Sequence, residues 1–131
     1  DTFPPLFSMS PAFDNGTSLG YNYTEEKIPR LLKDSNWTKS YEKKGYHHLR
    51  QEAHGGRFQH TELIAFLIKE YPSLRKNVRK LIGFDKKDVN QILLELQKFD
   101  VPVRFTKHRS DFISHIIETK RSALMQVLKN V

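Results

Sequence analysis

Apolar residues recur every three or four positions through most of the second half of the chain, which is the spacing of helices that bury one face. The first such segment runs from Gln59 to Tyr71, and Pro72 ends it because proline cannot continue a helix. The pattern therefore predicts a helix with a single apolar stripe. The stripe residues are Leu63, Ile64, Leu67, Ile68 and Tyr71.

Two more helices are expected directly after this one. Ser73 is the expected N-cap of a helix over residues 74–82, with Gly83 at its exit. Asp85 is the expected N-cap of the following helix, and Asp88 suits the positive end of its dipole. The residues that this helix is expected to bury are Val89, Ile92, Leu93 and Leu96.

The last helix is expected after a short extended connector, Val101–Phe105. Ser110 is its expected N-cap, and its apolar stripe continues for about twenty residues. A helix of that length with one apolar stripe is typical of an element that lies across a core. The stripe residues are Phe112, Ile113, Ile116, Ile117, Leu124, Val127 and Leu128.

The first half of the chain gives weaker patterns. Residues 1–24 are rich in Pro, Ser, Gly and Asn, so they are expected to be irregular. A helix is expected from Thr24 to Lys33, although Pro29 disfavours its interior. Residues 34–57 fit either short helices or a mobile loop.

These patterns predict a mainly α protein with one domain, residues 1–131, in which the irregular segment precedes a helical bundle, residues 25–131. A chain of 131 residues is long enough for a single core. The absence of cysteine excludes disulfides and thiolate metal sites. No apolar run reaches the length of about 18 residues that a membrane span needs, so no membrane partner is expected.

The segment SPAFDNGTSLG, Ser10–Gly20, is the first candidate for chemistry. Asn15-Gly16 favours a tight turn, because both residues tolerate positive φ. Asp14, directly before this turn, carries a carboxylate of the kind that Mg²⁺ prefers. Kinase-type enzymes use one such aspartate, on a loop, to hold the metal ion against the nucleotide phosphates. The residues alone leave both interpretations open, a structural turn and a metal-binding loop.

The longer stretch PPLFSMSPAFDNGTSLG resembles the metal-binding segment of the HipA-like serine/threonine protein kinases, which contains SP-x-(F/Y)-D and, in many members, NG-x-SL. The resemblance implies that Asp14 holds Mg²⁺ on ATP and that Asn15 helps to shape this cofactor site. It implies a mainly α fold, the helical C-lobe of a HipA-like kinase behind an irregular metal-loop segment. In the family this lobe ends in a long helix, to which SDFISHIIETKRSALMQVL is similar in kind.

Other parts that a kinase needs have no counterpart in this chain: a phosphate-binding loop, a lysine for the phosphates, and a catalytic Asp–Asn loop. In the family they lie upstream of the metal segment. The resemblance therefore implies the C-terminal part of a larger kinase, which is inactive alone and contains no assigned catalytic residue. Its implied partners are the N-terminal kinase half, a protein substrate and an antitoxin-like protein. The implied location is the bacterial cytoplasm, or a host cell into which an effector is secreted.

The net charge of +7 leaves a second interpretation open, a small basic helical module that binds nucleic acid. Its contacts would come from a basic stretch with interleaved aromatic residues, although a solvated surface explains the same residues. A third interpretation is a nuclease that uses His47, His48 or His54 for acid–base catalysis. The basic stretch comprises Lys39, Tyr41, Lys43, Lys44, Tyr46, His47, His48, Arg50 and Arg57, and a later helix adds Arg75, Lys76, Arg79 and Lys80 as expected surface.

Overall fold

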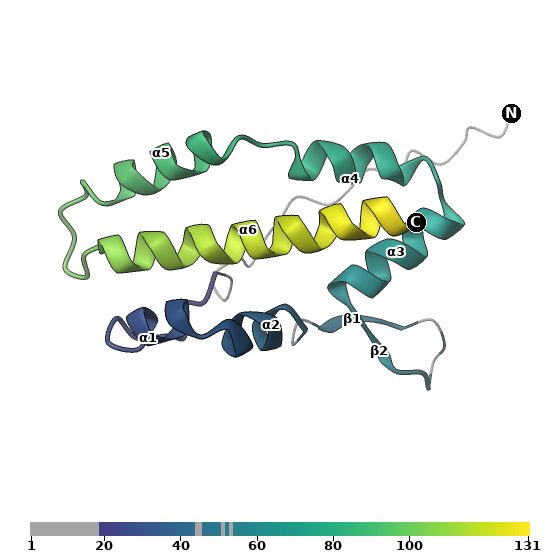
Figure 1. Ribbon diagram of the computed structural model, residues 1–131, viewed down its shortest axis with the longest axis horizontal. Helices are drawn as coiled ribbons and strands as arrows, with labels where there is room; N and C mark the ends of the chain where they lie inside the picture. Colours follow the sequence, from purple (N-terminus) through teal and green to yellow (C-terminus); the bar gives the residue numbers. More distant parts are fainter. Residues whose placement is uncertain (1–18, 44–45, 51, 53) are drawn as a thin grey trace, which may run out of the picture.

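The computed structural model describes residues 19–43, 46–50, 52 and 54–131 of the chain. This part of the protein is mainly helical, as the sequence predicts (Figure 1). No helix within it is long and apolar enough to cross a bilayer. The elements, in chain order, are α1 (Ile28–Lys33), α2 (Ser35–Lys43), β1 (Tyr46–Arg50), β2 (Arg57–Gln59), α3 (His60–Glu70), α4 (Leu74–Ile82), α5 (Lys86–Leu96) and α6 (Lys107–Asn130).

Helix α6 lies at the centre of the molecule, and the other helices pack around it (Figure 1). α1 and α2 cover one side of α6, α4 and α5 cover the opposite side, and α3 lies beside its C-terminal part. The surrounding helices have between 6 and 11 residues, and helices of this length are marginal alone in water. Their stability therefore depends on packing against α6, which has 24 residues.

An aromatic cluster fills the space between α6, α1 and α2. Phe112 of α6 and Ile28 of α1 are fully buried, and Ile116 is 3% exposed. The ring centroid of Trp37 lies 5.1 Å from that of Phe112, and the indole N–H donates to the Tyr23 hydroxyl at 3.3 Å. Burial of each large apolar side chain contributes about 1.5–3 kcal/mol to the free energy of unfolding, so this cluster stabilises the α1–α2 side strongly.

The helix caps test the sequence predictions at single residues. Asp85 caps α5, as predicted, and its carboxylate accepts a backbone N–H of the first turn at 2.8 Å. The prediction that Ser110 caps the last helix is wrong. α6 begins earlier, because the hydroxyl of Thr106 accepts the backbone N–H of Arg109 at 3.0 Å. Ser110 lies inside the helix, where it is buried.

The structure also corrects the number of elements in the first half of the chain. α1 begins at Ile28 rather than at Thr24, because the first turn of a helix accommodates Pro29, whose missing N–H needs no partner there. Residues 34–57, which fitted short helices or a loop, contain α2 and most of a β-hairpin. The described residues thus form six helices and two strands, and the hairpin is an element that the sequence patterns did not predict.

The hairpin is attached to α3. β1 and β2 pair antiparallel, with Arg50 opposite Arg57 and an irregularity in the register farther along the strands. The rings of Phe58 and Phe66 stack with centroids 5.4 Å apart, which holds β2 against α3. The backbone N–H of Gln59 donates to the carboxylate of Glu62 at 2.8 Å, so the strand leads directly into a capped helix.

α5 buries less of its apolar surface than the sequence predicts. Leu93 is buried, but Ile92 and Leu96, which were expected in the core, are 60% and 39% exposed. α5 lies at the outside of the molecule and packs mainly on α6, so only one narrow face is covered. Tyr71 is likewise 60% exposed, because it follows the last residue of α3 and points away from the bundle.

Candidate functional site

Asp14 and Asn15, the two residues predicted to hold the cofactor, lie outside the described residues. The structure places the last two residues of the SPAFDNGTSLG segment, Leu19 and Gly20, and so shows where this segment meets the helices. The candidate functional site therefore consists of this exit, the residues of α6 that support it, and two of the cavities beside α6.

The exit of the segment is a left-handed turn. Leu19 and Gly20 have backbone φ angles of 56° and 71°, a region that residues other than glycine rarely adopt. Gly20 is buried against α6, where an added Cβ would lie 2.6 Å from a ring carbon of Phe112 and 3.2 Å from a methyl group of Ile116. Only glycine therefore fits both the backbone angle and the space at this position.

Arg109, in the first turn of α6, holds the residues that follow the turn. Its Nε–H donates to Glu25 Oε1 at 2.8 Å, and its terminal nitrogens donate to the backbone oxygens of Gly20 at 3.1 Å and Tyr23 at 2.5 Å. The Thr106 hydroxyl donates to the other carboxylate oxygen of Glu25. The Arg109 side chain is 17% exposed, so these charge-assisted bonds form largely out of water, where they are strong. These hydrogen bonds attach the residues that follow the turn to the start of α6.

A mostly apolar cavity of about 490 Å³ lies beside Leu19, between α2, α3 and α6. Tyr41 forms part of its wall, and the ammonium group of Lys120 lies 5.6 Å from the centre of that ring. Burial raises the pKa of the Tyr41 hydroxyl above its usual value, and Tyr23 adds to this shift, so Tyr41 is neutral at physiological pH. The cavity suits an apolar side chain or a flat ring. Its aliphatic walls are Leu19, Ile64, Ile116 and Leu124.

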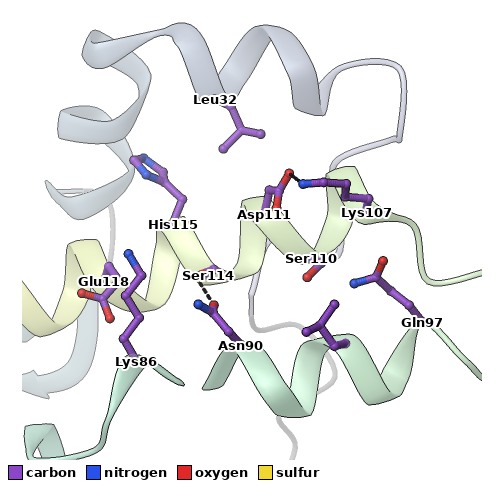
Figure 2. Close-up of a pocket in the computed structure, with 11 residues that line it drawn as sticks. Leu32, Lys86, Asn90, Gln97, Lys107, Ser110, Asp111, Ser114, His115 and Glu118 are labelled. Carbon is purple, nitrogen blue, oxygen red and sulfur yellow. Dashed lines mark hydrogen bonds and ion pairs between the residues drawn. The ribbon is translucent and has the colours of Figure 1, made fainter. Parts of the chain in front are cut away.

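A polar groove of about 580 Å³ lies along the N-terminal half of α6, between α1 and α5 (Figure 2). Leu32 projects into it from α1. The Ser114 hydroxyl of α6 donates to the side-chain oxygen of Asn90 on α5 at 3.2 Å. Lys107 and Asp111 form an ion pair at 2.8 Å on the same stretch of α6. The groove is therefore lined by small polar groups and by charges of both signs.

The groove brings a histidine and two serines together, but not as a catalytic pair. His115 Nε2 lies 2.9 Å from the hydroxyl oxygen of Thr38 on α2 and is engaged there. Ser114 is bound to Asn90, and Ser110 is only 8% exposed. A nucleophile needs a base within hydrogen-bond reach, and the described side chains of the groove provide no such pair. The arrangement is suited to binding a polar ligand.

Potential metal ligands are not clustered in the described part of the chain. Residues 19–43, 46–50, 52 and 54–131 contain no group of three or more His, Asp or Glu side chains that could hold a metal ion. His54 and His60 are exposed on the hairpin and at the start of α3. Because Asp14 lies outside these residues, Mg²⁺ and ATP binding stay predictions from the sequence.

Comparison with known proteins assigns no family to this geometry. No protein-family model matches the sequence, and no curated protein or solved structure is significantly similar to the chain. The resemblance to HipA-like kinases therefore rests on the sequence alone, on the residues of the motif and on the type and order of the helices expected after it.

The sequence patterns do not identify Arg109 or Gly20 as residues that hold the exit turn. One signal was present, because Arg109 lies three residues before Phe112 and so shares its core-facing side of the helix. A cation on such a face is rare unless it is paired. Its partners lie 84 to 89 residues away in the sequence, so local spacing could not identify them.

We expect Gly20→Ala to lower the free energy of unfolding by about 2–4 kcal/mol, because alanine is strained at this φ and its Cβ overlaps Phe112. Urea denaturation of the purified chain measures the change. Gly56→Ala is the matched control, since a Cβ there meets no atom within 4 Å, and its expected change is below about 0.5 kcal/mol. Equal effects of the two substitutions would contradict the packing of Gly20 on α6.

We expect Arg109→Met to lower the free energy of unfolding by about 2–4 kcal/mol, because the substitution leaves the Glu25 carboxylate and two carbonyl oxygens without their cation. Lys107→Met is the control. It removes a cation two residues away in α6, but the Lys107–Asp111 pair is exposed and contributes at most about 0.5 kcal/mol. Denaturation followed by Trp37 fluorescence compares the two, and a small loss for Arg109→Met would show that the guanidinium does not support the exit turn.

Proposed function

We propose that this chain is the helical C-terminal lobe of a HipA-like serine/threonine protein kinase. Together with an N-terminal half that carries the phosphate-binding and catalytic loops, it transfers the γ-phosphoryl group of ATP to a protein hydroxyl. Asp14 holds the Mg²⁺ ion and Asn15 shapes the loop around it. The observation that carries the proposal is the fixed exit of the SPAFDNGTSLG segment on the longest helix of the lobe.

The support for the exit matters because a metal-binding carboxylate must be held to within a fraction of an ångström of its working position. Leu19 follows Asp14 by five residues, so a fixed turn at Leu19 and Gly20 restricts where the loop can lie. Glycine packing and the Arg109 hydrogen bonds both act at this turn.

The order of the elements also supports the proposal. The family has the metal segment first, then helices only, then a long final helix. In the described residues, a segment exit is followed by short helices and ends in α6, with a small hairpin as the departure from an all-helical lobe. The polar groove and the apolar cavity give this lobe two surfaces for the other kinase half, a protein substrate or an antitoxin-like partner.

The test is phosphoryl transfer by the chain combined with the polypeptide encoded directly upstream of it, using radiolabelled ATP and Mg²⁺. We expect Asp14→Asn to lower the rate by about 100-fold or more, the scale of loss when a group that stabilises transition-state charge is removed. Asp100→Asn, an exposed position between α5 and α6, is the charge-matched control and is expected to keep full activity. The proposal fails if Asp14→Asn transfers phosphate at the normal rate, or if the 131-residue chain phosphorylates serine by itself.

A second candidate function, nucleic-acid binding, is favoured by the exposed face of α4. Lys76, Arg79 and Lys80 are exposed and have no hydrogen-bond or ion-pair partner among the described residues, and α4 contains no acidic residue. Such a row of cations suits phosphate groups. By contrast, Tyr41 is half-buried beside Trp37 and is not available to stack on a base, so binding would depend on charge.

If nucleic-acid binding is the function, replacing Lys76, Arg79 and Lys80 together by glutamine reduces the slope of log affinity against log salt by about 2–3. Fluorescence anisotropy with a labelled duplex measures this slope. The control replaces Lys27, Arg30 and Lys33, which are exposed at α1 and give the same change in net charge. The α4 surface is excluded as the nucleic-acid site if both triple variants reduce the slope equally. It is also excluded if the wild-type chain does not bind the duplex.

A further inference from the structure

The register of the β-hairpin places two arginines directly opposite each other. Arg50 of β1 pairs with Arg57 of β2, although the two are separated by a turn in the sequence. Directly paired residues of antiparallel strands project their side chains from the same face, with Cβ atoms about 4.5–5.5 Å apart. The hairpin therefore presents two arginine side chains on the same face.

This pair faces away from the body of the protein. Phe58 follows Arg57 and stacks on Phe66 of α3, so that side of β2 is turned toward the helix. Neighbouring residues of a strand point to opposite faces, so Arg57 and its partner Arg50 point to solvent. Both arginines are exposed.

No described carboxylate neutralises the pair. Neither arginine has an ion-pair or hydrogen-bond partner among the described residues. Glu62, at the start of α3, is engaged by the backbone N–H of Gln59. Glu52, in the hairpin turn, is exposed and makes no ion pair with a described residue. Like charges directly opposite each other destabilise a hairpin. The repulsion between the two arginines is therefore not offset by a described carboxylate in the free protein.

We propose that Arg50 and Arg57 form a binding site for a phosphorylated serine or threonine side chain of a protein. A phosphate monoester carries a charge of about −1.5 to −2, which matches two guanidinium groups, and its oxygens accept bidentate hydrogen bonds from arginine. Tyr46 lies on β1 and is 55% exposed, so its hydroxyl is available to a flanking residue of the bound polypeptide. The bound dianion removes the repulsion that the register creates.

A phosphorylated side chain fits this site better than other phosphates do. The backbone of nucleic acid offers one negative charge per phosphate, which leaves half of the paired positive charge unmatched. A free phosphate or nucleotide gains only the two arginines at an exposed site, whereas a polypeptide also gains contacts along the hairpin. The inference goes beyond the kinase proposal and does not require it, because the binding experiment needs no phosphoryl transfer by this chain.

The test uses two degenerate peptide libraries, one built around a central phosphoserine or phosphothreonine and one identical but unphosphorylated, each immobilised and exposed to the 131-residue chain. We expect retention on the phosphorylated library only. Arg50→Gln and Arg57→Gln are each expected to weaken it by about tenfold or more, the scale of one charge-assisted hydrogen-bonded group. Lysine at either position is expected to recover only part of it, because lysine keeps the charge but not the bidentate geometry.

Arg30→Gln is the control, since Arg30 is exposed on α1 and its substitution changes the net charge equally. It is expected to bind the phosphorylated library as the wild type does. Thermal unfolding separates binding from folding: Arg57→Gln is expected to keep or raise the midpoint, because it removes a repulsion. Equal retention on the two libraries overturns the proposal. It is also overturned if inorganic phosphate or ATP competes as strongly as a phosphopeptide. It is overturned as well if the chain binds duplex DNA and Arg30→Gln weakens that binding as much as Arg57→Gln does.

Discussion

The rest of the structure depends on one interaction, the packing of five short helices, α1 to α5, around α6. Each of α1 to α5 is too short to be stable alone in water. α6 supplies the buried side chains Phe112, Ile113 and Ile116, around which the two sides of the molecule assemble. A loss of order in α6 would therefore release every other helix at once, including the residues that hold the exit of the SPAFDNGTSLG segment.

Two kinds of positive charge serve different purposes in this protein. Arg109 is largely buried and fully engaged with one carboxylate and two carbonyl oxygens, so it stabilises the fold. Arg50, Arg57 and the exposed cations of α4 have no acidic partner among the described residues, so their charge is available to ligands. The net charge of +7 is the difference between 22 Lys and Arg and 15 Asp and Glu, so it does not distinguish the two kinds of cation. Burial and bonding partners distinguish them, because burying a cation without a partner would lower the stability of the fold strongly.

The proposed metal loop depends on the same central helix. Gly20 is packed on Phe112, and its carbonyl oxygen accepts from Arg109, so the position of the loop exit is tied to the start of α6. The cavity beside Leu19 and the groove between α1 and α5 also share α6 as a wall. A ligand or partner that shifts α6 would therefore act on the loop, the cavity and the groove together.

The sequence by itself determined the helical class, the helix over residues 60–70 and the Asp85 cap, because each depends on near neighbours in the chain. The metal-binding role of Asp14 stays a prediction from the sequence. The tertiary structure alone decided which apolar residues are covered: Ile92 fits the helical stripe, yet it is 60% exposed because α5 packs through one narrow face. It alone also decided the pairing of Arg50 with Arg57 and the partners of Arg109, which lie 84 to 89 residues away. Periodicity and capping report local geometry, whereas register and long-range hydrogen bonds exist only once the chain has folded.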